Sequence, residues 1–121
     1  MTGLHLVEKR VLVTGAAGGI GREMALGFAV EGAYVLVADL NGDGAEQTAQ
    51  MIREQGGQAH SATVDVTSAE SCAALAETAE QHLGGLDVLI NNAAAFAGLD
   101  RAPFWELDEG DWDKILSVNV K

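Results

Sequence analysis

Residues 11–21 read VLVTGAAGGIG, an apolar run followed by a glycine-rich turn. The run at residues 11–13 is typical of a strand that is buried on both faces. The turn leads into residues with helical periodicity, and the N-terminus of a helix binds phosphate through unpaired N–H groups and a partial positive charge. Glycines allow a sharp turn and a close approach of the backbone to a ligand. The stretch therefore predicts a strand, a nucleotide-binding turn and a helix.

The alternation of strand and helix patterns continues along the chain. Apolar runs at residues 35–38 and 88–90 predict two further buried strands, and the more polar residues 59–66 predict an edge strand. Apolar positions with helical spacing lie between these runs: Ile20, Met24 and Phe28, then Ala45, Thr48, Ala49 and Ile52, then Cys72, Leu75, Ala76, Ala79 and Leu83. A capping box at residues 67–70 begins the third helix, and a last helix is expected at residues 108–121.

The order of these elements is β-α-β-α-β-α-β-α. Strands that alternate with helices require right-handed crossovers and a parallel sheet covered on both faces. We therefore expect an α/β fold, a Rossmann-type doubly wound parallel sheet of four strands, in a single domain of residues 1–121. Gly32, Gly56 and Gly84 stand where three of the helices are expected to end.

The composition favours a globular protein and excludes several classes of partner. Of 121 residues, 48% are hydrophobic, which suffices for one core. The 18 acidic residues outnumber the 7 basic residues and give a net charge of −11. Binding of nucleic acid or anionic lipid needs clustered Lys and Arg, so we expect neither a nucleic-acid nor a membrane partner. The single cysteine and the absence of a signal-like N-terminus predict a cytoplasmic protein.

The glycine turn also indicates which nucleotide would bind. No Lys-Ser or Lys-Thr follows the glycines, so a P-loop is excluded. Asp39 ends the second strand, and a carboxylate there can accept hydrogen bonds from both hydroxyls of an adenosine ribose but would repel a 2′-phosphate. Neither Gly18 nor Leu40 supplies a cation to offset that repulsion. We therefore expect NAD to be preferred over NADP as the cofactor.

Four motifs, in this order, resemble those of the short-chain dehydrogenase/reductase family. They are Thr14-Gly15-x-x-x-Gly19-Ile20-Gly21, Asp65-Val66, Asn91-Asn92-Ala93-Ala94, and Asn119 within Ser117-Val118-Asn119-Val120. The resemblance covers nearly the whole chain, and it implies the N-terminal, cofactor-binding half of an NAD-dependent oxidoreductase. In one departure, Ala94 stands where the family usually has Gly.

The resemblance implies a role for each motif. Residues 15–21 would line the pyrophosphate of the cofactor, residues 65–66 would hold the adenine, and residues 92–94 would run along the ribose towards the nicotinamide. Asn91 would tie strands together. The implied cofactor-binding residues are Gly15, Gly18, Gly19, Ile20, Gly21, Asp39, Leu40, Asp65, Val66, Asn92, Ala93 and Ala94.

The catalytic group is incomplete within these residues. By resemblance, Asn119 joins a tetrad whose Ser, Tyr and Lys lie further along the family's sequence, and no Tyr-x-x-x-Lys occurs in residues 1–121. Tyr34, the single tyrosine, lies at the wrong end of its strand to act as the general acid. We expect hydride transfer between nicotinamide and a small alcohol or carbonyl substrate, no turnover by this chain alone, and a homo-oligomer.

Two other functions remain open at this point. A non-catalytic, truncated nucleotide-binding or interaction module would expose the apolar edge at residues 88–90 and associate through it. A domain that binds S-adenosylmethionine also has a glycine turn and an acidic residue after the second strand, but residues 65–66 and 91–93 argue against it.

The remaining reactive side chains predict no further site. His5, His60 and His82 lack the spacing of metal ligands, so we expect no metal. Cys72 lies on the apolar face of the third helix, which predicts a buried structural thiol.

Overall fold

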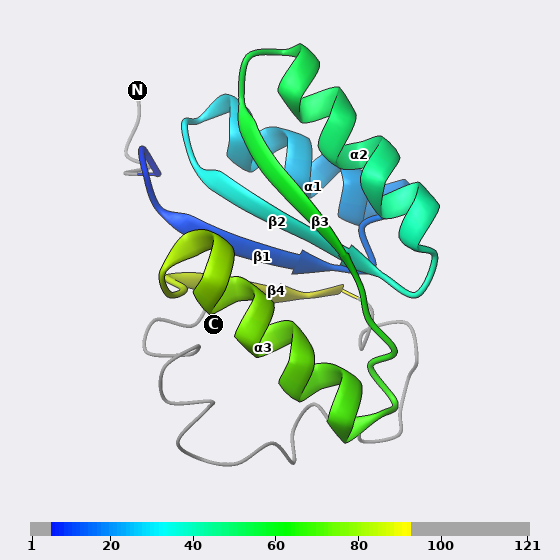
Figure 1. Ribbon diagram of the computed structural model, residues 1–121. Coiled ribbons are helices and arrows are strands. Elements are labelled where there is room, and N and C mark those ends of the chain that lie inside the picture. Colours follow the sequence, from blue (N-terminus) through cyan, green and yellow to red (C-terminus); the bar gives the residue numbers. More distant parts are fainter. Residues whose placement is uncertain (1–5, 93–121) are drawn as a thin grey trace.

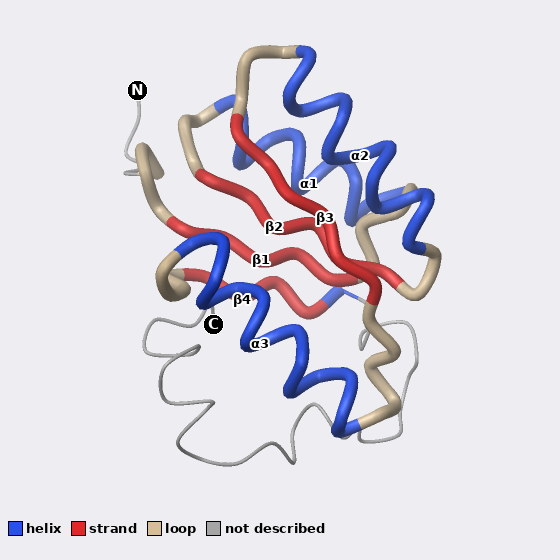
Figure 2. Tube along the Cα trace, viewed as in Figure 1, coloured by secondary structure: helices blue, strands red, loops and turns tan. Residues whose placement is uncertain are grey.

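The computed structural model describes residues 6–92. Strands and helices alternate along these residues (Figure 1 and Figure 2). The elements are β1 (Arg10–Thr14), α1 (Gly19–Val30), β2 (Tyr34–Asp39), α2 (Gly42–Glu54), β3 (Gln58–Thr63), α3 (Ala69–Leu83) and β4 (Val88–Asn91). The expected alternation is therefore confirmed as far as the fourth strand.

The strands form one parallel sheet in the order β3-β2-β1-β4. β1 pairs with residues 34–38 of β2 on one side and with residues 88–91 of β4 on the other. The chain thus winds outward from β1 to β3 and then returns to place β4 on the opposite side of β1. In open α/β sheets, ligands bind outside the carboxyl ends of the strands at such a switch point. Here the switch point lies where β1 and β4 end.

Helices cover both faces of the sheet, with α1 and α2 on one face and α3 on the other (Figure 1). Successive strand side chains point to opposite faces, so each strand contributes to both cores. The core with α1 and α2 includes Val11, Val13, Val35, Val37, Ala25, Ala29, Ala45, Ala49 and Ile52. The core with α3 includes Leu12, Leu36, Leu89, Cys72, Leu75 and Ala79. This arrangement confirms the doubly wound α/β fold and the core faces expected for α2 and α3.

The core face of α1 differs from the expectation. Its buried residues are Gly21, Ala25 and Ala29. The predicted stripe of Ile20, Met24 and Phe28 is wrong by one position, since Ile20 is 63% exposed and the other two are half-buried. Both sets recur every four residues, so periodicity does not choose between them. The small residues pack inward because they let the helix approach the strands closely.

Two further boundaries differ from those expected. The N-cap of α3 is Ser68, whose side chain accepts a hydrogen bond from the N–H of Ser71, so the capping residue lies one position after Thr67. β3 ends at Thr63 and not at residue 66, because its partner β2 ends at Asp39. β3 lies at the edge of the described sheet, as its polar sequence predicts. The helices end beside Gly32, Gly56 and Gly84, as expected.

Arg10 ties the amino end of β1 to the segment before β4. Its Nε and Nη2 donate to the carboxylate of Asp87 at 2.9 and 3.0 Å, and its backbone N–H donates to the same carboxylate at 2.8 Å. These bonds hold the pKa of Asp87 at about 2, chiefly through the side chain of Arg10. The ion pair therefore fixes β4 beside β1 at the end of the sheet opposite the glycine turn.

Some predictions concern residues outside the described range. The predicted last helix at residues 108–121, together with His5, Ala93, Ala94 and Asn119, lies outside residues 6–92. Among the helices within that range, none has both the length and the apolar character required to cross a membrane.

Candidate functional site

The turn between β1 and α1 has a backbone that glycine permits. Gly15 and Gly19 adopt φ angles of 66° and 57°. A Cβ on Gly21 would lie 2.1 Å from the carbonyl oxygen of Gly15 and 2.9 Å from Nδ2 of Asn92. In contrast, a Cβ on Gly18 or Gly19 would meet nothing within 4 Å. The turn is therefore tightly packed on its protein side and open on the other, which leaves room for a ligand against the backbone.

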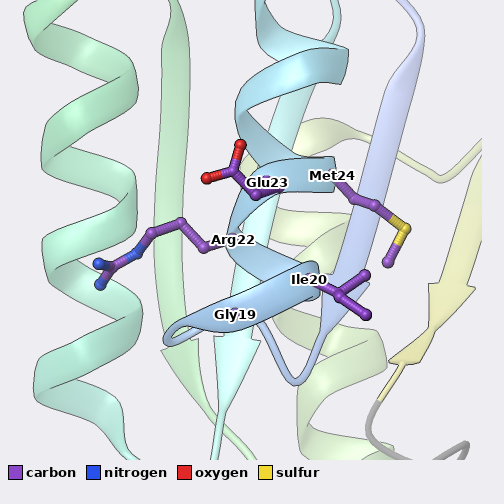
Figure 3. Close-up of a pocket in the computed structure, with 5 residues that line it drawn as sticks. All are labelled: Gly19, Ile20, Arg22, Glu23 and Met24. Atoms are coloured by element: carbon purple, nitrogen blue, oxygen red, sulfur yellow. The ribbon is translucent and has the colours of Figure 1, made fainter.

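Helix α1 begins without a side-chain cap. Its N-cap residue is Gly18, no side chain accepts a hydrogen bond there, and the first turn holds no acidic residue. Because the first N–H groups of a helix have no partner within the helix, this end offers donors and a partial positive charge to an anion. Figure 3 shows a surface pocket around the same turn, in which Arg22 extends towards α2 while Ile20 and Met24 extend to the other side of α1.

Asp39 joins the end of β2 to this turn. Its Oδ2 accepts a hydrogen bond of 2.9 Å from the backbone N–H of Ala17, and its Oδ1 accepts one of 2.9 Å from the N–H of Asn41. Each carboxylate oxygen can accept a second hydrogen bond. The residue predicted to bind ribose therefore lies beside the glycine turn with acceptor capacity to spare, and the 70% exposed Leu40 follows it.

Two residues that the sequence motifs did not single out hold the turn from behind. The buried hydroxyl of Thr48 on α2 donates a hydrogen bond of 2.7 Å to the carbonyl oxygen of Ala16. Arg22 on α1 donates from Nε to that hydroxyl at 2.8 Å and from Nη2 to the carbonyl oxygen of Ala17 at 2.7 Å. Two helices thus bind consecutive carbonyl groups of the turn.

Arg22 and Asp39 both contact Ala17, a relationship that the reasoning from Gly18 and Leu40 did not consider. The guanidinium of Arg22 binds the carbonyl oxygen of Ala17, while the carboxylate of Asp39 binds the N–H of the same residue. The sequence feature that could have indicated this contact is the position of Arg22 directly after the last glycine of the turn. A side chain in the first turn of α1 can reach back to the loop.

The end of β4 completes the site with two asparagines. Asn92 donates from Nδ2 to the carbonyl oxygen of Gly15 at 3.1 Å. The hydroxyl of Thr14 donates to Oδ1 of Asn91 at 3.1 Å, so Asn91 ties β4 to β1 as expected. The switch point of the sheet and the glycine turn are therefore joined directly.

Asp65 and Val66 lie just after β3, at the same end of the sheet as Asp39. Oδ1 of Asp65 accepts hydrogen bonds from the backbone N–H and the hydroxyl of Thr67, and these bonds lower the pKa of the carboxyl. Val66 is half-buried against the core that contains α3. The loop after β3 is thus held in shape from within, beside the end of β2.

The comparisons with known proteins agree with this geometry. A family profile described as short chain dehydrogenase matches residues 9–121. The chain belongs to the short-chain dehydrogenase/reductase family. It is 39% identical over 117 residues to the 7alpha-hydroxysteroid dehydrogenase of Escherichia coli (strain K12), covering 97% of this chain and 44% of that relative. It is 38% identical over 117 residues to glucose 1-dehydrogenase 2 of Bacillus subtilis (strain 168), covering 95% and 44%.

Solved structures of short-chain dehydrogenases share the fold. A 7 alpha-hydroxysteroid dehydrogenase complexed with NADH and 7-oxo glycochenodeoxycholic acid superimposes with a TM-score of 0.72 at 34% identity, covering 93% of this chain and 48% of that chain. The chain thus spans less than half the length of these relatives. The family assignment confirms the resemblance of the four motifs and disfavours the alternative of an S-adenosylmethionine-binding domain.

The other reactive side chains lie away from the glycine turn. Tyr34 begins β2 at the opposite end of the sheet and lines a pocket with His60 and His82. The rings of these histidines stack with centroids 4.3 Å apart. The structure thus brings together two residues that lie far apart in the sequence. Residues 6–92 contain no group of three or more His, Cys, Asp or Glu that could hold a metal ion. Cys72 is buried as predicted, and desolvation raises the pKa of its thiol to about 11.

Proposed function

We propose that residues 1–121 form the cofactor-binding half of an NAD-dependent short-chain dehydrogenase/reductase. The reaction is hydride transfer between nicotinamide and the alcohol or carbonyl group of a small substrate. The observation that carries this proposal is the glycine turn, which is open over Gly18 and Gly19 and continues into an uncapped helix N-terminus. A dinucleotide pyrophosphate is an anion that needs such donors and such a close approach.

The residues of the site fit this cofactor. The turn at residues 15–21 receives the pyrophosphate, Asp39 with Leu40 receives the adenosine ribose, and residues 65–66 contact the adenine. By family resemblance, Asn92, Ala93 and Ala94 would lie along the ribose towards the nicotinamide. When bound, the nicotinamide supplies the carbon that gives or takes the hydride. The related 7 alpha-hydroxysteroid dehydrogenase, whose structure holds NADH, supports this assignment.

The preference for NAD over NADP rests on Asp39. Its two oxygens retain acceptor sites for ribose hydroxyls, and its charge repels a 2′-phosphate. Arg22 directs its guanidinium to Thr48 and to the carbonyl oxygen of Ala17, and within residues 6–92 it forms no ion pair with Asp39.

Proton transfer to or from the substrate oxygen requires groups that residues 1–121 do not contain. A general acid has to lie within hydrogen-bond reach of the reacting oxygen. By family resemblance Asn119 supports a Ser, Tyr and Lys, and no Tyr-x-x-x-Lys occurs in these residues. A polypeptide limited to residues 1–121 therefore binds NADH without catalysing its oxidation. We further propose a cytoplasmic homo-oligomer as the active form, in keeping with the single cysteine and with the family.

Titration of the chain with NADH and NADPH, followed by nicotinamide fluorescence, tests the cofactor assignment. We expect binding of NADH in the micromolar range and an NADPH dissociation constant at least about tenfold higher, as expected for a charge-assisted ribose contact. Equal affinity for the two cofactors contradicts the assignment of Asp39, and binding of neither contradicts the proposed function.

An activity screen tests the proposed reaction. The full natural chain that contains residues 1–121 is assayed for NADH formation with primary and secondary alcohols, hydroxysteroids and sugars, because the relatives are named for a steroid and for a sugar. The same panel is run with a polypeptide of residues 1–121. Turnover by the full chain and none by the shorter one supports the proposal. Turnover by the shorter polypeptide shows that the Tyr-x-x-x-Lys is not required.

A further inference from the structure

The three carbonyl groups of residues 15–17 each accept a hydrogen bond from a side chain of another part of the fold. Asn92, at the end of β4, binds the carbonyl of Gly15 at 3.1 Å. Thr48 on α2 and Arg22 on α1 bind the next two carbonyls, each at 2.7 Å. A loop whose oxygens are held from three directions has little freedom to rotate its peptide planes.

Holding a carbonyl also directs the N–H group that follows it. In a planar trans peptide the C=O of one residue and the N–H of the next point in opposite directions. The bond from Thr48 to the Ala16 carbonyl thus turns the N–H of Ala17 away from α2, and that N–H meets Asp39. By the same geometry, the bond from Arg22 to the Ala17 carbonyl turns the N–H of Gly18 away from the Arg22 side chain.

The consequence is a turn whose oxygens face the protein. The N–H of Gly18 joins the free donors at the start of α1, and a Cβ on Gly18 would meet nothing within 4 Å. A peptide flip that exposed the Ala17 carbonyl there would place an oxygen against the phosphates and repel them. These two peptides therefore have to be kept from rotating if the cofactor is to bind.

We propose that Thr48 and Arg22 are positioning residues for the cofactor pyrophosphate, an inference that rests on the proposed function. Together they form a clamp in which the Thr48 hydroxyl accepts from Nε of Arg22 and donates to the turn. Neither touches the cofactor in this proposal. They keep the turn in the one arrangement that presents N–H groups to an anion.

The hydrogen bonds of Thr48 support a role beyond its own helix. A threonine inside a helix ordinarily donates to the carbonyl four residues earlier, which here is that of Gly44, at 3.3 Å. A hydroxyl has one hydrogen to donate, and its shorter bond of 2.7 Å goes to the turn. Thr48 is 0% exposed on a helix face otherwise built from glycine, alanine and isoleucine, so this buried hydroxyl is directed towards the turn.

Matched variants of the full natural chain that contains residues 1–121 test the clamp. Thr48→Val removes the hydroxyl at similar volume, Thr48→Ser keeps it, and Arg22→Gln removes the guanidinium. Gln47→Val, on the exposed side of α2, is the control. Each variant is titrated with NADH, with ADP-ribose and with adenosine, which lacks phosphate. Thermal unfolding of each variant is recorded in parallel.

The expected result is a selective loss of phosphate binding. Thr48→Val and Arg22→Gln raise the dissociation constants of NADH and ADP-ribose by about tenfold, as loss of one buried or charged hydrogen bond implies, and leave that of adenosine within about twofold. Thr48→Ser restores the wild-type values. If Thr48→Val does not unfold cooperatively, Arg22→Gln decides the question.

Three results overturn the clamp. An equal loss of adenosine affinity shows that the variants damage the whole fold, and unchanged affinity for NADH shows that the turn does not need them. A wild-type protein that binds neither NADH nor ADP-ribose overturns the proposed function and the clamp with it. Unaffected variants beside a wild type that binds NADH overturn the clamp alone.

Discussion

The backbone N–H of Ala17 donates a hydrogen bond of 2.9 Å to Oδ2 of Asp39, and this bond joins the glycine turn to the end of β2. Oδ1 of the same carboxylate accepts from the N–H of Asn41. A carboxylate has about four lone-pair sites on its two oxygens, so it can accept these bonds and ribose hydroxyls together. Asp39 is therefore expected both to shape the turn and to select the cofactor.

Replacement of Asp39 with Ser is expected to weaken NADH binding and to narrow the difference between NADH and NADPH. The variant loses the charge that repels a 2′-phosphate and the acceptor that holds the N–H of Ala17. We expect the NADH dissociation constant to rise by about tenfold to a hundredfold, as for the loss of charge-assisted hydrogen bonds. Fluorescence titration with both cofactors measures the change.

Asp43→Ser is the matched control for this prediction. Asp43 is exposed, lies in the first turn of α2 and undergoes the same change of charge. A similar loss of NADH affinity in both variants would mean that the overall charge, and not the position of Asp39, governs cofactor binding. A ratio of NADH to NADPH affinity that Asp39→Ser leaves unchanged would contradict the selection argument.

Alanine at Gly21 is expected to destabilise the protein, whereas alanine at Gly27 on the same helix is expected to stabilise it. A Cβ on Gly21 would lie 2.1 Å from the carbonyl oxygen of Gly15, but one on Gly27 would meet nothing within 4 Å. Overpacking costs about 1–3 kcal/mol of the free energy of unfolding, and glycine to alanine inside a helix gains about 0.5–1 kcal/mol. Urea unfolding of the two variants measures both changes in the free energy of unfolding. Changes of the same sign and size would contradict the close packing at Gly21.

The strands and two of the helix faces could be predicted from the sequence because burial leaves a local pattern. Runs of valine mark β1 and β2, which lie in the centre of the sheet and are covered on both faces. The polar sequence of β3 indicates its place at the edge. In α2, the apolar positions have no rival set at the same spacing, so Ala45 and Ile52 are buried as expected.

The remaining features could not be predicted because they depend on contacts between distant residues. In α1, hydrophobicity favours Ile20 over its neighbour Gly21, yet it is the close approach to the turn that selects the glycine. The contact of Arg22 with Thr48 joins positions 26 residues apart on two helices. No periodicity within either helix indicates that these side chains meet.

Replacement of Asp87 with Asn is expected to lower the free energy of unfolding at pH 7 by about 1–2 kcal/mol, because Arg10 loses a half-buried, multiply hydrogen-bonded partner. The folded state holds the pKa of Asp87 at about 2, below its ordinary value of 3.8. A lowered carboxyl pKa stabilises the fold above the unfolded pKa, and this contribution is lost as the pH falls from about 4 towards 2. Urea unfolding measures the free energy of unfolding at pH 7 and at pH 3. We expect it to fall less between these two pH values in the variant than in the wild type.

The ion pair of Arg53 with Glu46 is the control for Asp87. Its N–O distance of 2.8 Å is as short, but the two side chains are 37% and 52% exposed. Exposed pairs contribute little, so Glu46→Gln is expected to change the free energy of unfolding by less than about 0.5 kcal/mol. If Asp87→Asn and Glu46→Gln lower the free energy of unfolding equally, burial does not explain the contribution of the Arg10 pair to stability.

The stacked rings of His60 and His82 predict a loss of stability on mild acidification. Desolvation, followed by the proximity of His82 and Arg53, lowers the pKa of His60 below its ordinary 6.5, while Glu46 opposes the shift. A histidine whose pKa is lower in the folded state favours folding while it is neutral, and this contribution is lost as the pH falls below about 6.5. We expect the melting temperature to fall between pH 7.5 and pH 5.5.

Two substitutions should move this pH dependence in opposite directions. His82→Gln removes the neighbouring ring that disfavours a charge on His60, so the melting temperature should depend less on pH between 7.5 and 5.5. Glu46→Gln removes the carboxylate that favours the charged form of His60, so the dependence should become steeper. Asp87, with a pKa of about 2, titrates below this window and does not contribute to it. If the melting temperature changes equally with pH in the wild type and in both variants, the protonation of His60 is not coupled to folding.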